Sequence, residues 1–208
     1  MKLSCVVDHI ALQVAGAPRA LIESKLLLAA QQFYSESRCF ERACDALHVF
    51  PKVRYYEVDT GHYGFGIAGI EQVSIQGHPL IPTTLSNLDQ WFAWEQQQGM
   101  PTHFFRQGSA ELGMFPLPNM EEGECVVMQV RATLVPISIQ AVIDSRDIEA
   151  LIAGALSRLL VIKSGEWAHL GLADFYKSEF RDAIAMKSNL ALKGDLNVPL
   201  QVAYRPLA

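Results

Sequence analysis

Apolar residues in the last third of the chain recur with the period of an α-helix. Between residues 144 and 163 they are spaced three and four apart, which places them on one buried helix face. These positions are Ile148, Leu151, Ile152, Ala155, Leu156, Leu159 and Leu160. A second stripe follows, made of Ala173, Tyr176, Phe180, Ala183 and Ile184. The pattern predicts two helices joined near Gly165, the second ending at Gly194, because glycine favours a helix end.

Two helices with one apolar stripe each need a further surface to cover both stripes. Residues 21–34 offer that surface, because apolar side chains surround nearly the whole helix predicted there. Pro18 is well placed near its N-terminus, and we expect this helix to run to about Arg42. The expected bundle core draws on all three helices, through Leu27, Phe33, Ile152, Leu156, Leu159, Tyr176 and Phe180.

The middle of the chain has the period of β-strands instead. In residues 125–136, Val126, Met128 and Val130 point one way while Gln129 and Arg131 point the other. A shorter alternating segment at 72–76 runs into a glycine turn, which predicts a hairpin. Further strands are expected at 53–58, 63–67, 103–106 and 111–115, a short helix at 86–98, and a short strand or extended arm at 3–14.

These elements predict an α+β fold. Residues 15–47 and 137–194 form a helical bundle from the N- and C-terminal helices, and residues 48–136 form an inserted antiparallel β-rich domain. Two prolines bar a helix from residues 195–208, which we interpret as an extended C-terminal arm. The apolar side chains spaced along this arm are Val198, Leu200, Val202, Tyr204 and Leu207.

Composition narrows the functional classes. The chain has 208 residues, 50% of them hydrophobic and 19% charged, which is enough apolar content for a core and leaves some apolar surface for a partner. The formal net charge is −5 and no Lys/Arg cluster occurs, so the footprint of tight nucleic-acid binding is missing. The four cysteines lack zinc-site spacing, and we expect a soluble, unexported protein of a reducing compartment.

Two local patterns are candidates for chemistry. Residues 64–69 read G-F-G-I-A-G, but a dinucleotide site needs a helix after the last glycine, and a strand pattern follows here. We therefore interpret these glycines as bends in a twisted sheet. Asp59 and His62 could be an acid–base pair or two metal ligands, but no third ligand has a recognisable spacing. We expect no catalytic residue, no cofactor and no metal site.

The order of several motifs resembles that of a known family. The first helix contains A-A-x-x-F-Y from Ala29, and the middle contains G-M-P-x-H-F from Gly99 and L-G-M-F-P-x-P from Leu112. The last two helices contain I-A-G-A-L-S-R-L-L from Ile152, then a tryptophan, then L-A-x-x-Y-x-x-E-F from Leu172. In this combination the chain resembles the head-to-tail adaptors of tailed phages, the family of the tail tubular protein A and related connectors.

The resemblance implies a virion structural protein without a catalytic site. Members of this family combine a helical bundle with an inserted β-sheet domain, and form a twelve-fold ring under the portal at the capsid vertex. DNA passes through the lumen of the ring, and the next tail component, the nozzle, binds below it. The C-terminal tail reaches onto the portal, so residues 195–208 are the expected portal-binding arm. Such a protein is assembled in the host cytoplasm and has no membrane partner.

Two alternatives remain open from the sequence. The first is another ring protein of the neck or tail, such as a stopper or a head-completion protein, which shares the ring but not the portal contact. The second belongs to a different class, a small cytosolic enzyme that uses residues 59–69.

Overall fold

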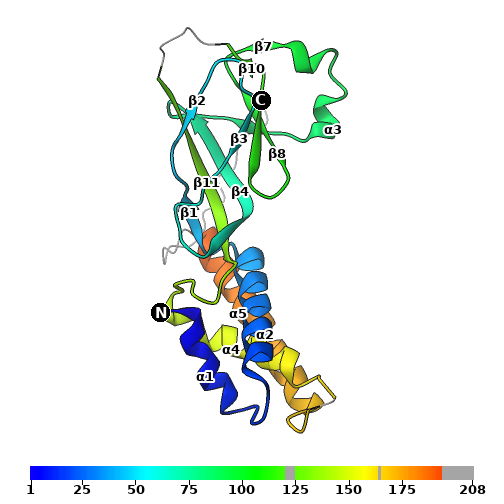
Figure 1. Cartoon of the computed structure of the whole chain (residues 1–208). Helices are drawn as coiled ribbons and strands as arrows, with labels where there is room; N and C mark the ends of the chain where they lie inside the picture. The colour runs from blue at the N-terminus through cyan, green and yellow to red at the C-terminus, as the bar shows by residue number, and fades with distance from the viewer. Residues whose placement is uncertain (120–124, 164, 194–208) are drawn as a thin grey trace. The chain divides into compact units, whose positions relative to one another are not determined.

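The chain is a mixed α+β protein whose contacts divide into two compact units. The computed structural model describes residues 1–119, 125–163 and 165–193 (Figure 1). Among the described residues, a helical unit contains Met1, Leu3–Cys39 and those from Ile143 to Lys193, and a β unit contains Lys2 and those between Phe40 and Val142. Residues 40–47 and 137–142 thus group with the sheets, which displaces the unit boundaries from the predicted positions at 47 and 137.

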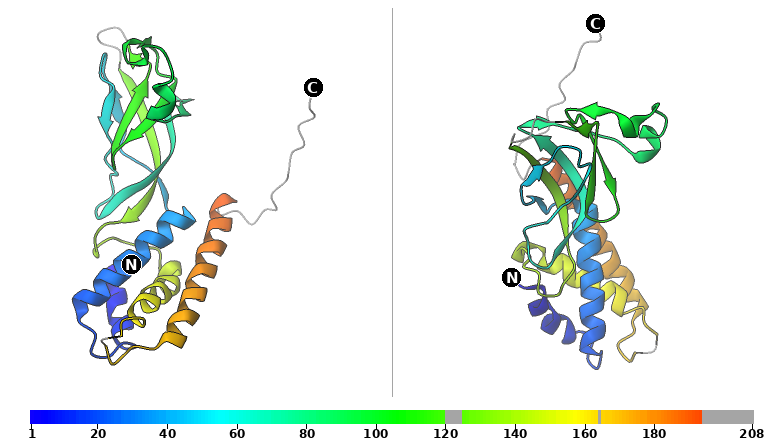
Figure 2. Two further views of the ribbon diagram at one scale, coloured as in Figure 1. Left: turned by 90° about the vertical axis from the view of Figure 1, so that its right-hand side faces the viewer. Right: turned by 45° about the horizontal axis from the view of Figure 1, so that its top comes forward.

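The helical unit brings together helices from the two ends of the sequence. Its helices are α1 (Val6–Ala11), α2 (Arg19–Ser37), α4 (Ile148–Leu159) and α5 (Leu170–Leu192), with 3₁₀ turns at Leu3–Cys5 and Ser145–Asp147. Helices α2, α4 and α5 contact one another pairwise and lie side by side (Figures 1 and 2). Within the described ranges, no helix has both the length and the apolar character needed to cross a membrane.

These three helices approach one another closely at Gly154. A Cβ atom at this position would lie 2.6 Å from Cε2 of Phe180 on α5 and 3.0 Å from Cβ of Ala29 on α2. Glycine is therefore the residue that lets α4 fit between its neighbours. Leu156 and Leu159 are fully buried beside this contact, and Phe33 stacks obliquely on Phe180 with ring centroids 6.3 Å apart.

Two sequence predictions about the helices are wrong. Residues 3–14 form a 3₁₀ turn and helix α1 rather than a strand or arm, with Leu3, Val6 and Ile10 fully buried. Helix α2 ends at Ser37 and not near Arg42, because Arg38 takes a left-handed conformation with φ +53°. Helix α2 is buried at several positions, including Leu26, Ala29 and Phe33, while Leu28 is 47% exposed.

The β unit contains two larger sheets and one short pair of strands. The first sheet runs in the order β1 (Glu41–Ala43), β11 (Val126–Pro136), β4 (Phe65–Ile75), β5 (His78–Pro79), with β2 (Leu47–Val49) also paired to β11, and it is antiparallel throughout. The second runs β3 (Tyr55–Glu57), β9 (Glu111–Phe115), β8 (His103–Gln107), β6 (Ile81–Pro82). Strands β7 (Gln98–Gly99) and β10 (Leu117–Pro118) form the pair.

Alternating side chains of both sheets build one shared core. It includes the predicted inward face of β11, and its members are Val49, Tyr56, Val58, Val73, Ile75, Leu80, Phe104, Leu112, Met114, Val126, Met128 and Val130. Arg106 also ties the sheets together, because its guanidinium donates to the carbonyl oxygens of Ile67 at 2.9 Å and Ala68 at 2.6 Å on the edge of β4. These bonds satisfy carbonyls that face no neighbouring strand.

The β region differs from prediction in three places. The segments 63–67 and 72–76 are one strand, β4, which keeps pairing with β11 through two register shifts near Gly69. The short helix at 86–98 is instead α3 (Leu85–Leu88), capped by Thr84, and a 3₁₀ turn Trp94–Gln96, separated by Ala93 at φ +49°. The strand pairs β6–β8 and β7–β10 are parallel, so the β unit is not antiparallel throughout.

Replacing Leu156 by Ala should lower the free energy of unfolding by ~2–5 kcal/mol, because it removes a fully buried side chain from the contact of three helices. Urea unfolding followed by circular dichroism measures this change. Leu192→Ala is the matched control, since Leu192 is 73% exposed on α5 and its loss should change stability by less than about 0.5 kcal/mol. Equal effects of the two substitutions would contradict the assigned core.

Candidate functional site

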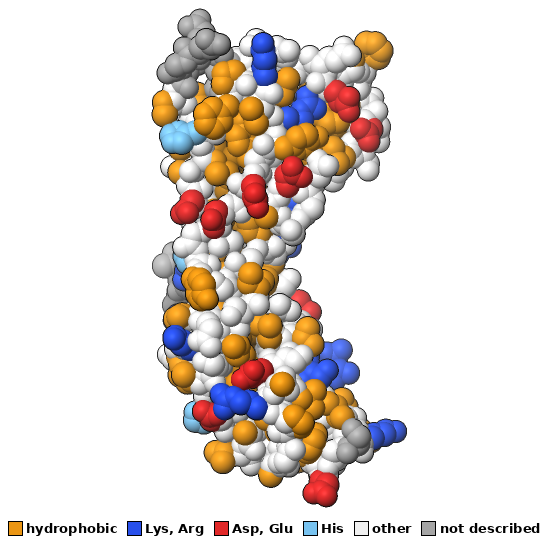
Figure 3. All heavy atoms as spheres, in the orientation of Figure 1, with side chains coloured by type: hydrophobic (Ala, Val, Ile, Leu, Met, Phe, Trp, Pro, Cys, Tyr) orange, Lys and Arg blue, Asp and Glu red, His pale blue; other side chains and the backbone are white. Residues whose placement is uncertain are grey.

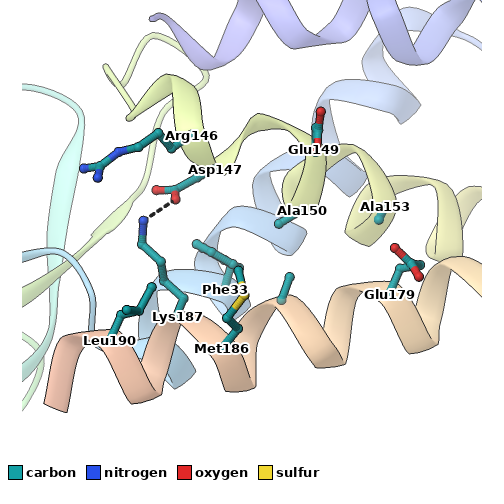
Figure 4. Close-up of a pocket in the computed structure, with 11 residues that line it drawn as sticks. Phe33, Arg146, Asp147, Glu149, Ala150, Ala153, Glu179, Met186, Lys187 and Leu190 are labelled. Carbon is teal, nitrogen blue, oxygen red and sulfur yellow. Dashed lines mark ion pairs between the residues drawn. The ribbon is translucent and has the colours of Figure 1, made fainter. Parts of the chain in front are cut away.

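A buried polar cluster joins three segments of the helical unit. Asp147, in the turn before α4, is only 3% exposed. Its carboxylate lies 2.8 Å from Nζ of Lys187 on α5 and accepts a hydrogen bond of 3.0 Å from the hydroxyl of Tyr34 on α2. Figure 4 shows Lys187 reaching from α5 towards Asp147. One carboxylate therefore holds both other helices.

The protonation of this cluster follows from burial and from the charge of Asp147. Burial disfavours the charged form of Lys187, but the hydrogen bond and the negative charge of Asp147 outweigh it, so the pKa of Lys187 is raised. Burial and the same carboxylate raise the pKa of Tyr34. Burial also raises the pKa of the nearby Cys39 thiol, which opposes formation of a reactive thiolate. The cluster has the character of a structural clamp.

A groove of about 340 Å³ opens beside this clamp, between α4 and α5. Its floor consists of small residues, and its wall includes Met186, which is 64% exposed, and Leu190. Glu179 projects from α5 at the end of the groove far from Leu190, and Glu149 lies on α4, with its carboxylate pointing away from α5 (Figure 4). We call Glu149, Glu179, Met186 and Leu190 the acidic flank.

The two carboxylates of the acidic flank carry its uncompensated charge. The groove is also lined by Arg146 and by Lys187, and both are already paired. Arg146 lies 2.6 Å from Asp144, and Lys187 is held by Asp147. Glu149 and Glu179, by contrast, form no ion pair with any residue that the structure describes.

A second groove, of about 380 Å³, lies on the other side of α5. Arg158 of α4 is half-buried there, donates to the Gly154 carbonyl and to the Gln32 side chain, and lies over the Phe180 ring at 5.2 Å. Lys177 and Arg181 project beside it from α5. We call Arg158, Lys177 and Arg181 the basic flank.

The basic flank has a net positive charge. Asp174 is the one acidic residue lining this groove, against three cations. Neither Lys177 nor Arg181 forms an ion pair within the described residues. In Figure 3, Lys and Arg side chains gather over the part of the helical unit where Figure 1 draws α4 and the beginning of α5.

The predicted bundle residues differ in burial. Phe33, Leu156, Leu159 and Phe180 are buried in the helical unit, whereas Leu27, Ile152 and Tyr176 are half-buried. The hydroxyl of Tyr176 donates a hydrogen bond of 3.1 Å to the side-chain oxygen of Gln13 at an exposed position. The predicted arm residues Val198, Leu200, Val202, Tyr204 and Leu207 lie outside the described residues.

The segment 59–69 shows a turn followed by a strand. Residues 65–69 of the glycine motif are the first five residues of β4, and a register shift against β11 lies on each side of Gly69. A strand and not a helix therefore follows the last glycine, and these irregularities agree with the interpretation of the glycines as bends in a sheet. Gly64 takes φ +81°, a conformation that favours glycine. Asp59 accepts from the amide of Gly61 at 3.0 Å, and the ring of His62 bonds to the Thr60 carbonyl at 2.7 Å. Both side chains are thus engaged in bonds local to the turn.

Asp59 also lines a groove of about 470 Å³ beside the edge of β4, but His62 does not. The structure therefore does not bring this candidate acid–base pair to one cavity. Across the described residues, no group of three or more potential ligands from His, Cys, Asp and Glu is placed to hold a metal ion.

Sequence reasoning missed the clamp and both flanks. Lys187 lies three residues after Ile184 on the buried stripe of α5, and a lysine at such a position needs a buried acid. That signal could have found its pairing with Asp147. The basic flank combines residues of two helices, so no run of charge in the sequence marks it. Comparisons with known protein families and with curated proteins find no match.

Because Tyr34 is buried against Asp147, we expect the free energy of unfolding to decrease at high pH. Above about pH 10 an exposed tyrosine ionises, so the unfolded chain releases a proton that native Tyr34 retains, and the free energy of unfolding must fall as the pH rises. Tyr34→Phe should remove this contribution, which is about 1.4 kcal/mol per pH unit. Urea unfolding of both proteins across this pH range measures it. Parallel pH profiles for the two proteins would show that Tyr34 titrates normally.

Proposed function

We propose that this chain is a virion structural protein, a head-to-tail adaptor that forms a ring under the portal of a tailed phage. In this proposal the helical unit is the bundle of the family, and the β unit is its inserted sheet domain. Copies of the chain close into a ring, twelve-fold as in the family, with DNA passing through the lumen. The portal lies on one side, and the downstream nozzle component lies on the other.

One observation carries this proposal. Helices from both ends of the chain form one unit with a β unit inserted between them, in the order that the motif resemblance implies. The motifs also fall at packing positions of that unit. Gly154 is the close contact of three helices, and Phe33 and Phe180 stack across it.

The surface of the helical unit supports self-association. Helix α5 exposes an unusual number of large apolar side chains, namely Leu170, Leu172, Phe175, Met186, Leu190 and Leu192. Apolar surface of this kind on one helix is typical of a protein–protein contact. A closed ring needs two different contact faces on every copy, and the acidic and basic flanks provide two.

The purified chain should assemble into a ring. Sedimentation velocity over a concentration series should show a large species of defined size, whose fraction of the total protein increases with protein concentration. This species should bind the portal protein encoded in the same genome. A stopper or head-completion protein would form the ring without binding the portal. A small enzyme using Asp59 and His62 would stay a single copy at all concentrations, and that result would contradict the proposal.

Removing residues 195–208 should weaken portal binding without unfolding the chain. The apolar side chains of this segment, including Val202 and Tyr204, are those expected to lie on the portal. Circular dichroism checks the fold, and a pull-down with the portal measures the affinity of both chain lengths. Portal affinity that is unchanged by the truncation would count against the arm.

A further inference from the structure

We propose that the acidic flank of one copy docks on the basic flank of the next copy, head to tail around the ring. This inference rests on the proposed function, because it specifies how the ring would be held together. The partner it names is a second copy of this chain. The contact would join Glu149 and Glu179 of one helical unit to Lys177 and Arg181 of its neighbour.

The two flanks lie on opposite sides of α5. Lys177 and Glu179 are two residues apart, which is about 200° around a helix axis, and Arg181 lies as far from Glu179 in the other direction. The buried stripe of α5, which includes Phe180 and Ile184, lies between the two flanks and faces the other helices of the unit. A head-to-tail ring requires two different contact faces on every copy, and these two sides of α5 supply them.

The charges of the flanks are complementary. Glu149 and Glu179 have no cationic partner in the described part of the chain, and Lys177 and Arg181 have no anionic one. Docking one flank on the other would pair all four side chains. A symmetric contact of a flank with itself would instead place like charges together, so electrostatics favours the head-to-tail arrangement.

Shape and apolar content fit the same occupant. The acidic flank has a groove with a floor of Ala150, Ala153 and Ala183 and an apolar wall at Met186 and Leu190. The basic flank presents Val161, which is 47% exposed, next to its cations. Val161 and the cations of the basic flank therefore complement the apolar wall and the carboxylates of the acidic flank.

A charge exchange tests the contact. The variant Glu149→Lys/Glu179→Lys makes both flanks positive, and Lys177→Glu/Arg181→Glu makes both negative. Each should self-associate ~10-fold or more weakly than the natural chain, because every contact now sets like charges together. An equimolar mixture of the two variants should recover assembly, because each flank then meets its opposite. Sedimentation velocity at ~0.15 M salt or lower measures this, since higher salt screens exposed pairs.

Two controls accompany the exchange. Glu166→Lys/Asp182→Lys reverses two exposed acidic residues outside both flanks and should assemble like the natural chain. Circular dichroism and thermal unfolding of every variant show that the helical unit is intact. Arg158 is left unchanged, because it bonds to Gly154 and Gln32 inside the unit.

Each outcome separates the flank contact from the ring itself. If either variant alone assembles as well as the natural chain, the flank contact is wrong, although the ring itself is not contradicted. The same conclusion follows if the mixture of the two folded variants does not recover assembly. A mixture that stops at a closed pair of copies would overturn the head-to-tail order. Lys177→Glu/Arg181→Glu that keeps assembly but loses binding of a short DNA duplex would assign the basic flank to DNA. A natural chain that never self-associates would end both proposals.

Discussion

The structure depends on one close contact among three helices that come from opposite ends of the sequence. Helices α2, α4 and α5 meet at Gly154, where any side chain would collide with Phe180 and Ala29. Because α2 precedes the β unit and α4 follows it, this contact closes the chain around the insert. Burial of Leu156 and Leu159 beside it supplies apolar stabilisation, at about 25 cal/mol per Å² of apolar area removed from water.

The clamp adds specificity to this contact. Apolar stripes alone allow helices to slide by a turn, whereas the carboxylate of Asp147 must meet both Lys187 and Tyr34. A buried ion pair adds little net stability, because desolvation of the charges offsets their attraction, but a misplaced partner would leave a buried charge unpaired. Our hypothesis is that the clamp fixes the register of α5, and with it the positions of Lys177 and Glu179 on the two flanks.

Much of the fold could be predicted from periodicity, and the misses have physical causes. Helix α5 buries one stripe and strand β11 alternates over its first half, so their periods are plain. Helix α4 and strand β9 are apolar enough to be recognised, although both are buried on more than one face. The 3₁₀ turn and helix α1 also have a helical period, at Leu3, Val6 and Ile10. Because the segment is short and contains β-branched valines, its sequence is equally typical of a strand. The end of α2 and the start of the 3₁₀ turn Trp94–Gln96 depend on left-handed residues, Arg38 and Ala93, that no composition rule marks. The flanks arise only when two helices pack, so a linear pattern could not contain them.

In the proposed assembly, copies of the chain pack side by side through their helical units into a closed ring. Electron cryo-microscopy of the assembled natural chain tests this most directly. We expect closed rings around an open lumen, with the α4–α5 groove that carries Glu179 in each copy against the side of α5 that carries Lys177 in the next. Rings held only by their β units, or a field of single copies at every concentration, would contradict it.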